Sequence, residues 1–260
     1  EHKRKLPWRE ISFDKDLQMR DPYKILISEI MSQQTQIDRV IPKYEAWLRA
    51  FPTVHELAKA SIADVLAHWS GLGYNRRALQ LKKTAEIIIN EYAGTFPQNE
   101  KMLLTFPGIG PYTARAMLCF AFNQQVAVID TNVRKVILTQ FSFKQAEVTE
   151  KELEQIAVQL LPKDKAYEWN QALMDYASAV LKKEKIKIPK QSKFVGSHRY
   201  YRGQVLKVLL VQKQLQRTAL GNLIKNEYTE ADADWLGILL EELAKEGFIS
   251  VTQGMIRLKS

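Results

Sequence analysis

The sequence holds one cysteine among its 260 residues, Cys119, which lies in the apolar run 116–121. A single thiol excludes a disulfide within the chain and any metal or iron–sulfur site built from several cysteines. No run approaches 18 apolar residues, and the first residues lack the pattern of a signal peptide. We therefore expect a protein of the reducing cytoplasm with no membrane segment, in which Cys119 is a small buried hydrophobe.

Acidic residues are also scarce relative to basic ones. The chain has 38 Lys and Arg against 29 Asp and Glu, a formal charge of +9 and a pI of about 9.4. This excess favours a polyanionic partner, with nucleic acid first and an acidic membrane surface second. Charge alone is also compatible with a merely basic protein that binds neither.

Alternating strand patterns are nearly absent before residue 181, so this part is expected to be all-α. Asp21 and Pro22 have the pattern of a helix N-cap and first turn. A short apolar run at 126–129 also fits a strand, and it ends at Asp130, a predicted N-cap. Helical periodicity predicts helices near 23–32, 37–51, 76–93, 114–122, 133–141, 148–161 and 166–182.

The composition changes after residue 181. Residues 182–199 are rich in lysine and predict a linker, or an arm that follows DNA phosphates. Residues 200–260 predict three helices, near 203–212, 217–226 and 232–247, and a hairpin over 248–258 that turns at Gln253 and Gly254. This is the pattern of a small winged-helix-like α+β domain. Winged helices bind DNA or dock proteins, and the sequence leaves both roles open.

Residues 103–117 predict two helices joined by a tight hairpin. Pro107 ends the first helix, Gly108 and Gly110 are expected at positive φ, and Pro111 opens the second helix. The free backbone N–H groups at such a helix start can bind a phosphate. Taken alone, the same motif also joins ordinary helices.

Seven segments in collinear order resemble the helix-hairpin-helix DNA glycosylases, most closely their MutY-type branch of adenine DNA glycosylases. The resemblance covers about residues 6–181 and implies an all-α glycosylase domain, 1–181, of two helical lobes with a cleft between them. The segments are LPWR (6–9), DPY (21–23), SEIMSQQTQ (28–36), GLGY (71–74), FPGIGPYTARAM (106–117), VIDTNVRKV (128–136) and NQALMDY (170–176).

Two carboxyl groups suit the cleavage of an N-glycosidic bond. Asp130, as a helix cap, can stay ionised and stabilise a positively charged sugar, which is the role of the matching residue in the family. Glu29 lies among apolar residues that would raise its pKa, so that it can protonate adenine at N7. The ordinary alternative is that Glu29 pairs with a neighbouring cation. The resemblance implies that Tyr112 hydrogen-bonds near Asp130 and the sugar, and that Asn132 orients the catalytic groups.

The resemblance also assigns contacts to DNA with a flipped base. It implies that Gln34 and Tyr74 are wedges, that Thr35 and Leu72 face the opposite base, and that Gln171 lines the adenine pocket. Gly108 and Gly110 would hold the DNA backbone, and Arg76, Arg77 and Lys82 would follow phosphates. These assignments have ordinary alternatives. Gln34 would be an exposed amide, Leu72 and Tyr74 would pack at a helix end, and the three cations would lie on a solvated helix face. Bifunctional relatives carry a lysine where this chain has Tyr112, so we expect a monofunctional enzyme.

The sequence departs from the family in two places. Most relatives have four cysteines after the helix that ends near Leu181, and these hold a [4Fe–4S] cluster. Here the lysine-rich run takes their place, so we expect no cluster and no metal site, while a monovalent cation at the hairpin stays open. Adenine glycosylases also usually carry a Nudix-like C-terminal domain that recognises 8-oxoguanine, and residues 200–260 are too short for one.

The most direct expectation is therefore a monomeric, cytoplasmic and nucleoid-associated enzyme that removes adenine opposite guanine or 8-oxoguanine in double-stranded DNA. The main alternative is a thymine or uracil glycosylase for G:T and G:U mismatches, since those enzymes share the tyrosine and the aspartate. A second alternative is a hairpin-type DNA-binding protein without activity, which would leave Glu29 and Asp130 without a purpose.

Overall fold

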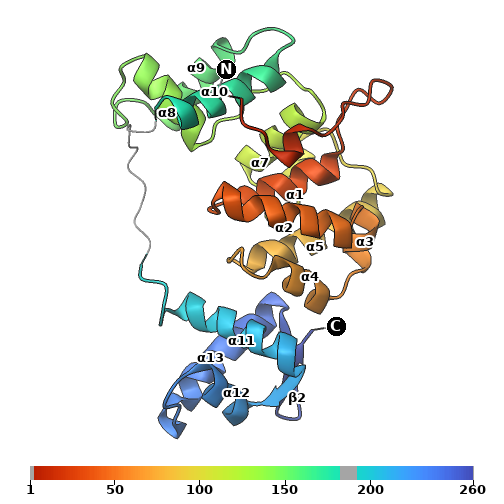
Figure 1. The fold of residues 1–260 in the computed structure, drawn as a ribbon, viewed down its shortest axis with the longest axis vertical. Coiled ribbons are helices and arrows are strands. Elements are labelled where there is room, and N and C mark those ends of the chain that lie inside the picture. The colour runs from red at the N-terminus through yellow and green to blue at the C-terminus, as the bar shows by residue number, and fades with distance from the viewer. Residues whose placement is uncertain (1–2, 182–191, 260) are drawn as a thin grey trace. The chain divides into compact units, whose positions relative to one another are not determined.

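The computed structural model describes residues 3–181 and 192–259. The chain divides into two compact units. Unit 1 comprises Glu1–Glu45 and Ile87–Pro189, and unit 2 comprises Ala46–Glu86 and Lys190–Ser260. Figure 1 shows the helices and strands along the chain. Residues 182–191 of the predicted linker, 182–199, lie outside the described residues. The next helix begins at His198, inside the predicted linker range and five residues before the predicted helix start near 203.

Unit 1 is built from helices, as the sequence predicts. Among its described residues the only β-type pairing is an isolated bridge between Asp14 and Met19. Its elements are a 3-10 turn (Pro7–Arg9), α1 (Pro22–Ser32), most of α2 (Ile37–Ala50), the end of α5 (Arg76–Tyr92), α6 (Glu100–Leu103), α7 (Pro111–Ala116), a π-helical segment (Met117–Ala121), α8 (Thr131–Gln140), α9 (Glu150–Gln159) and α10 (Ala166–Ala179).

The π-helical segment Met117–Ala121 forms the centre of unit 1. All five of its residues are buried, and the segment contacts α1, α7 and α10. The apolar run was predicted to be buried as one helix over 114–122. Its burial is confirmed, but the α-helix ends at Ala116 and the wider π-turns follow, a local change that packing can impose on an apolar run.

The run 126–129 is irregular, so the strand alternative is wrong. Its backbone is held by one buried side chain, Asn170 on α10. The Val128 N–H donates to Asn170 Oδ1 at 2.9 Å, and Asn170 Nδ2 donates to the carbonyl of Val126 at 3.1 Å. Because these bonds satisfy the backbone in place of a strand partner, the chain reaches Asp130 in a fixed position.

The first part of unit 2 is a helical cluster around two tryptophans. It contains the end of α2, α3 (Val54–Lys59), α4 (Ile62–Trp69) and most of α5. Trp47 and Trp69 are fully buried and meet edge to face, with ring centroids 5.6 Å apart. Thr53 and Ser61 cap α3 and α4 as their sequence context suggests.

The second part of unit 2 has the order of elements of a winged helix. The elements are α11 (His198–Gln212), β1 (Gln214–Gln216), α12 (Arg217–Ile224), a 3-10 turn (Glu230–Asp232), α13 (Ala233–Glu246), β2 (Ile249–Thr252) and β3 (Met255–Leu258). The strands form an antiparallel sheet in the order β1-β3-β2, with Leu215 opposite Ile256 and Val251 also opposite Ile256. The sequence predicts the hairpin but not β1, because three residues are too few to show an alternating pattern.

Candidate active site

Glu29 lies in the last turns of α1, a helix buried on most of its sides. Asp21 caps this helix by accepting from the N–H groups of Tyr23 at 3.0 Å and Lys24 at 3.3 Å, and Pro22 occupies the first turn. Ile25, Ile30 and five other residues of α1 are buried, whereas Glu29 is half-buried. Glu29 therefore extends from a packed, apolar helix, and its carboxyl group is buried near Tyr112, Asp130 and Arg9.

Asp130 is the N-cap of α8, as predicted. Its Oδ1 accepts from the N–H of Val133 at 2.7 Å, and its Oδ2 accepts from Nδ2 of Asn132 at 2.7 Å. These two bonds fix both oxygens of the carboxyl group at the positive end of the helix dipole. The predicted role of Asn132 as an orienting group agrees with this contact.

Tyr112 lies near both carboxyl groups. Its phenol is hydrogen-bonded to the carboxyl of Glu29, and it also feels the charge of Asp130. Burial, followed by these two negative neighbours, raises the pKa of Tyr112 well above 10. The phenol therefore stays protonated and acts as a hydrogen-bond donor at neutral pH.

Both carboxyl groups hold their protons more tightly than in water. Burial raises the pKa of Glu29 from 4.5 to about 7, and the neighbouring Asp130 adds to the rise, while the Tyr112 hydrogen bond and the charge of Arg9 oppose it. Burial also raises the pKa of Asp130, against the hydrogen bonds from Val133 and Asn132 that lower it. The helix cap was expected to lower the pKa of Asp130 and keep it ionised. Burial has the larger effect, so the pKa is raised. Such a pair titrates as a coupled unit.

Arg9, in the matched segment LPWR, forms a buried ion pair that the sequence did not reveal. Arg9 Nη1 lies 2.8 and 2.7 Å from the two carboxylate oxygens of Asp175, and Arg4 Nε lies 2.6 Å from one of them. The side chain of Arg9 is 4% exposed and that of Asp175 is 9% exposed. Burial opposes ionisation of Asp175, but the bonds and charges of the two arginines prevail and lower its pKa. This contact ties the N-terminal segment to α10.

The hairpin between α6 and α7 has one glycine in the left-handed region. Gly108 has φ +82°, as predicted, but Gly110 has φ −97° and is the N-cap of α7. The prediction of positive φ at Gly110 is wrong, because an N-cap takes extended backbone angles. A Cβ built on Gly110 would meet no atom within 4 Å, so the backbone here is open to a close approach. Pro111 occupies the first turn of α7.

Two residues expected to meet the DNA share an unusual backbone conformation. Gln34 has φ +53° and Tyr74 has φ +49°, backbone angles that residues other than glycine rarely adopt. Gln34 is exposed at the end of α1 in unit 1, next to the half-buried Thr35. Tyr74 is 44% exposed in the turn before α5 in unit 2. Strained backbone of this kind occurs at ligand-contacting positions, but eight other non-glycine residues among those described share a positive φ, so the angle alone does not mark a contact.

The other predicted contacts in unit 2 divide into exposed and buried side chains. Arg76 is exposed, whereas Leu72 is only 5% exposed and does not present its side chain to a partner in this conformation. Arg77 is buried, donates to the carbonyls of Leu72 and Gly73 at 3.1 Å each, and has a pKa lowered by burial to about 10. Arg77 thus holds the turn rather than a phosphate.

Lys82, another residue considered for phosphate contact, is also engaged inside unit 2. Its Nζ lies 2.7 Å from Glu86 and 2.9 Å from the carbonyl of Ala58. Its side chain is 12% exposed. Lys82 therefore anchors α5 to the end of α3, and of the three cations suggested on α5 only Arg76 is presented outward.

Gln171 lies on α10 beside the buried Asn170 and is half-buried. Asn170 also contacts the thiol of Cys119 at 3.5 Å. Burial raises the pKa of Cys119 to about 12, so this thiol is a packed hydrophobe rather than an available metal ligand. The one cysteine of the chain does not fit the four-cysteine [4Fe–4S] cluster of the family. Across residues 3–181 and 192–259, no three His, Cys, Asp or Glu side chains are grouped to hold a metal.

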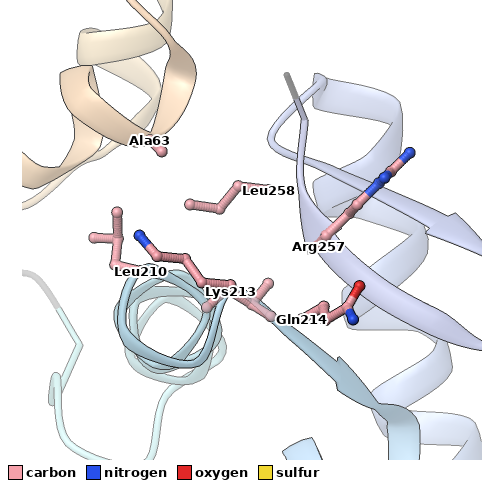
Figure 2. Close-up of a pocket in the computed structure, with 7 residues that line it drawn as sticks. Ala63, Leu210, Lys213, Gln214, Arg257 and Leu258 are labelled. Atoms are coloured by element: carbon pink, nitrogen blue, oxygen red, sulfur yellow. The ribbon is translucent and has the colours of Figure 1, made fainter.

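A hollow of about 260 Å³ lies within unit 2. Figure 2 shows Lys213 pointing toward Leu210, Ala63 and Leu258, while Arg257 extends away from them. None of the predicted catalytic or DNA-contacting residues lines this hollow. Among the helices that the structure describes, none combines the length and apolar character needed to cross a membrane.

Residues 27–163, more than half of the chain, match the model of the HhH-GPD superfamily of base excision DNA repair proteins. The chain belongs to this family. The matched region contains Glu29, Tyr112 and Asp130, so the three linked side chains lie within the family's own segment.

Relatives of the HhH-GPD family with two different names resemble the chain. It is 40% identical over 179 residues to the adenine DNA glycosylase of Mycolicibacterium smegmatis, covering 68% of this chain and 59% of the relative. It is 32% identical over 191 residues to the thymine/uracil-DNA glycosylase of Methanothermobacter thermautotrophicus, covering 72% of this chain and 83% of the relative. The chain thus spans about three fifths of the first relative's length.

A solved HhH-GPD structure confirms the fold class. A thermostable thymine-DNA glycosylase superposes with a TM-score of 0.61 at 31% identity, covering 68% of this chain and 80% of that one. The expected all-α helix-hairpin-helix glycosylase fold is therefore confirmed, and the small three-stranded sheet in the part after residue 191 accompanies it.

Proposed function

We propose that the chain is a monofunctional DNA glycosylase that removes adenine opposite guanine or 8-oxoguanine by hydrolysis. The observation that carries the proposal is the grouping of Glu29, which is hydrogen-bonded to Tyr112, with the nearby charge of Asp130. It combines a carboxyl group whose pKa is raised to about 7 with a second carboxyl group at a helix N-terminus. Two carboxyl groups in different environments are what acid-assisted cleavage of a glycosidic bond requires.

Glu29 acts as the general acid. An adenine anion is a poor leaving group, so the proton of Glu29 is transferred to N7 of the base as the bond to the sugar breaks. A pKa near the working pH lets the group hold the proton and still release it. In the proposed complex, a base that has been flipped out of the duplex lies against the half-buried Glu29.

Asp130 stabilises the sugar. Loss of the base leaves positive charge on C1′ and the ring oxygen, and the Asp130 carboxylate lies at the end of α8 to balance that charge. Water then adds to C1′ and releases one proton, which leaves an abasic site in an intact strand. The bonds from Val133 and Asn132 hold both oxygens of Asp130 in place throughout.

The monofunctional character follows from Tyr112. A Schiff base with the sugar needs an amine, and a phenol with a raised pKa offers none. The proposed chemistry uses water and the side chains of the chain itself.

Double-stranded DNA is the proposed partner of a monomeric enzyme. The formal charge of +9 supports binding to phosphates. The open backbone at Gly110, on the helix N-terminus after the hairpin, supports a phosphate contact. Gln34 and Tyr74, with their strained backbones, are proposed to fill the gap left by the flipped base, with Thr35 at the opposite base and Gln171 at the pocket.

A thymine or uracil glycosylase for G:T and G:U mismatches is the second candidate. The chain covers 83% of a relative with that name, and a solved thymine-DNA glycosylase superposes on it. Higher identity to adenine glycosylases favours adenine. Protonation by Glu29 also favours adenine, because a purine offers N7 as the site to receive the proton.

The distinguishing experiment uses four labelled duplexes, A:8-oxoguanine, A:G, T:G and U:G, incubated with the full chain and then treated with alkali. We expect the two adenine duplexes to be cleaved and the other two to stay intact. The cleavage should appear only after alkali treatment. Cleavage of T:G and U:G alone would establish the second candidate. Binding to all four without cleavage would show a DNA-binding protein that lacks activity.

A further inference from the structure

Charge is divided sharply between the elements of the winged-helix part of unit 2. Residues 192–226, which contain α11, β1 and α12, hold seven Lys and Arg and no acidic residue. Residues 227–246, which contain α13, hold seven Asp and Glu and one lysine. In a helix-turn-helix arrangement, α12 and α13 correspond to the pair whose second helix enters the major groove of DNA. Here that second helix carries the acidic residues.

Part of this acidic charge is neutralised inside the unit. Glu242 is paired with His198 at 2.6 Å and with Arg202 at 3.1 Å, and Glu246 is paired with Arg202 at 2.8 Å. Asp232 is paired with Lys225. These acids attach α13 and the turn before it to the basic elements, and they are not available to a partner.

The outward face of α13 is different. Asp234, Ile238, Glu241 and Lys245 follow one another at spacings of four, three and four residues, so they form one row on the helix. All four are exposed, and Ile238 is 59% exposed. Within 3–181 and 192–259 no ion pair is found for Asp234 or Glu241. The row spans roughly 16 Å at 1.5 Å per residue.

We propose that this row on α13 docks a protein segment that presents Lys or Arg on both sides of an apolar side chain. Two carboxylates that flank an isoleucine would repel DNA phosphates, so the row is unsuited to the major groove. A basic segment matches both charges and covers the isoleucine. Charge complementarity of this kind sets specificity and the rate of association. The part of the row from Asp234 to Glu241, about two turns long, matches one face of a short partner helix, and Lys245 lies one turn beyond it.

The direct test uses two synthetic helical peptides and the full chain. The first peptide presents a row of Lys, Leu and Lys on one face, and the second has Glu in place of both lysines. With fluorescent peptides and anisotropy, we expect the lysine peptide to bind at least tenfold more tightly than the glutamate peptide. Equal affinities for the two peptides, or no binding of either, would overturn the proposal.

Matched variants locate the binding. Ile238→Asp and Glu241→Lys should each weaken binding of the lysine peptide at least fivefold. Val211→Asp places the same change at another exposed apolar residue of unit 2, 72% exposed, and Glu91→Lys makes the same charge change at an exposed position of unit 1. Neither control should change the affinity by more than twofold. Equal losses in variants and controls would show general charge attraction instead of docking on α13.

DNA binding supplies the opposing test. If α13 faced DNA, Glu241→Lys would add a phosphate contact and steepen the salt dependence of binding to a 25-base-pair duplex by about one ion. We expect the salt slope of Glu241→Lys to equal that of Glu91→Lys. A steeper slope in Glu241→Lys alone would place DNA on α13 and contradict the proposal, whatever the outcome for the glycosylase activity.

Discussion

The phenol of Tyr112 donates a hydrogen bond to the carboxyl group of Glu29. The bond favours the ionised form of Glu29, whereas burial and the charge of Asp130 favour the protonated form. The pKa of about 7 is the balance of these opposing effects. Burial therefore sets the direction of the pKa shift of Glu29, and Tyr112 moves the pH range over which Glu29 can serve as an acid to lower values.

The rate of base removal should follow a bell-shaped pH profile. Glu29 must be protonated, so the single-turnover rate should fall about tenfold per pH unit above a pH of about 7. Asp130 must be ionised, and since its pKa is raised above 3.8 the acidic limb should begin above that value. Rates measured from pH 4.5 to 9 check this. A flat profile between pH 6 and 9 would remove Glu29 as the acid.

Tyr112→Phe should move the basic limb to higher pH. The substitution removes the hydrogen bond that lowers the pKa of Glu29 and leaves burial and Asp130 to raise it. Single-turnover rates across pH measure the shift. Tyr92→Phe is the matched control, because Tyr92 only packs edge to face against Phe106. A limb that stays in place in Tyr112→Phe would mean that the phenol does not tune Glu29.

Glu29→Gln should stabilise the fold at pH 8. In the unfolded chain Glu29 ionises near its ordinary 4.5, but in the fold it ionises near 7, so the wild-type protein loses stability as pH rises from about 4.5 to 7. The glutamine has no charge to bury, and the gain is up to about 3 kcal/mol above pH 7. Urea unfolding at pH 5 and pH 8 measures it. Exposed Glu91→Gln should change stability by less than about 0.5 kcal/mol, and a gain of equal size at both pH values would contradict the explanation.

The buried contact between Arg9 and Asp175 should be costly to break on one side only. Asp175→Asn leaves the buried Arg9 without its counter-charge and should cost about 3–5 kcal/mol. The double variant Arg9→Met, Asp175→Leu should cost less than the sum of the single changes. Arg4→Gln, whose side chain is 30% exposed, should cost less than Asp175→Asn. Chemical unfolding at pH 7 of these variants and of the two single changes Arg9→Met and Asp175→Leu gives the values, and additive losses in that cycle would show that the two groups act independently.

Much of the helical fold could be predicted because local chemistry marks its boundaries. Asp21, followed by Pro22, and Asp130 were predicted as helix caps, and each of them is one. The features that were missed depend on tertiary contacts. The π-turns after Ala116 reflect burial on all sides, and β1 exists because β3 pairs with it.

The candidate site shows the same limit. Glu29, Tyr112 and Asp130 could be named from motifs, and the structure brings them together. The roles of Arg9, Asp175 and Asn170 could not be predicted from the sequence, because their partners lie far along the chain and no local pattern connects them. They fall inside the matched segments LPWR and NQALMDY, which was the only available signal. Leu72 was expected at the DNA surface, but an apolar side chain after a helix end packs inward instead.

The central claim is that Glu29 and Asp130 perform the chemistry on a base held by the rest of the protein. Its most direct test is the single-turnover rate of adenine release from an A:G duplex by Glu29→Gln and Asp130→Asn, with the dissociation constant for DNA measured in parallel. We predict a loss of at least 100-fold in rate for each variant, in the range found for catalytic acids and charge-stabilising groups, with DNA affinity within about threefold of the wild type. Rates equal to the wild type in either variant, with DNA still bound, would contradict the account.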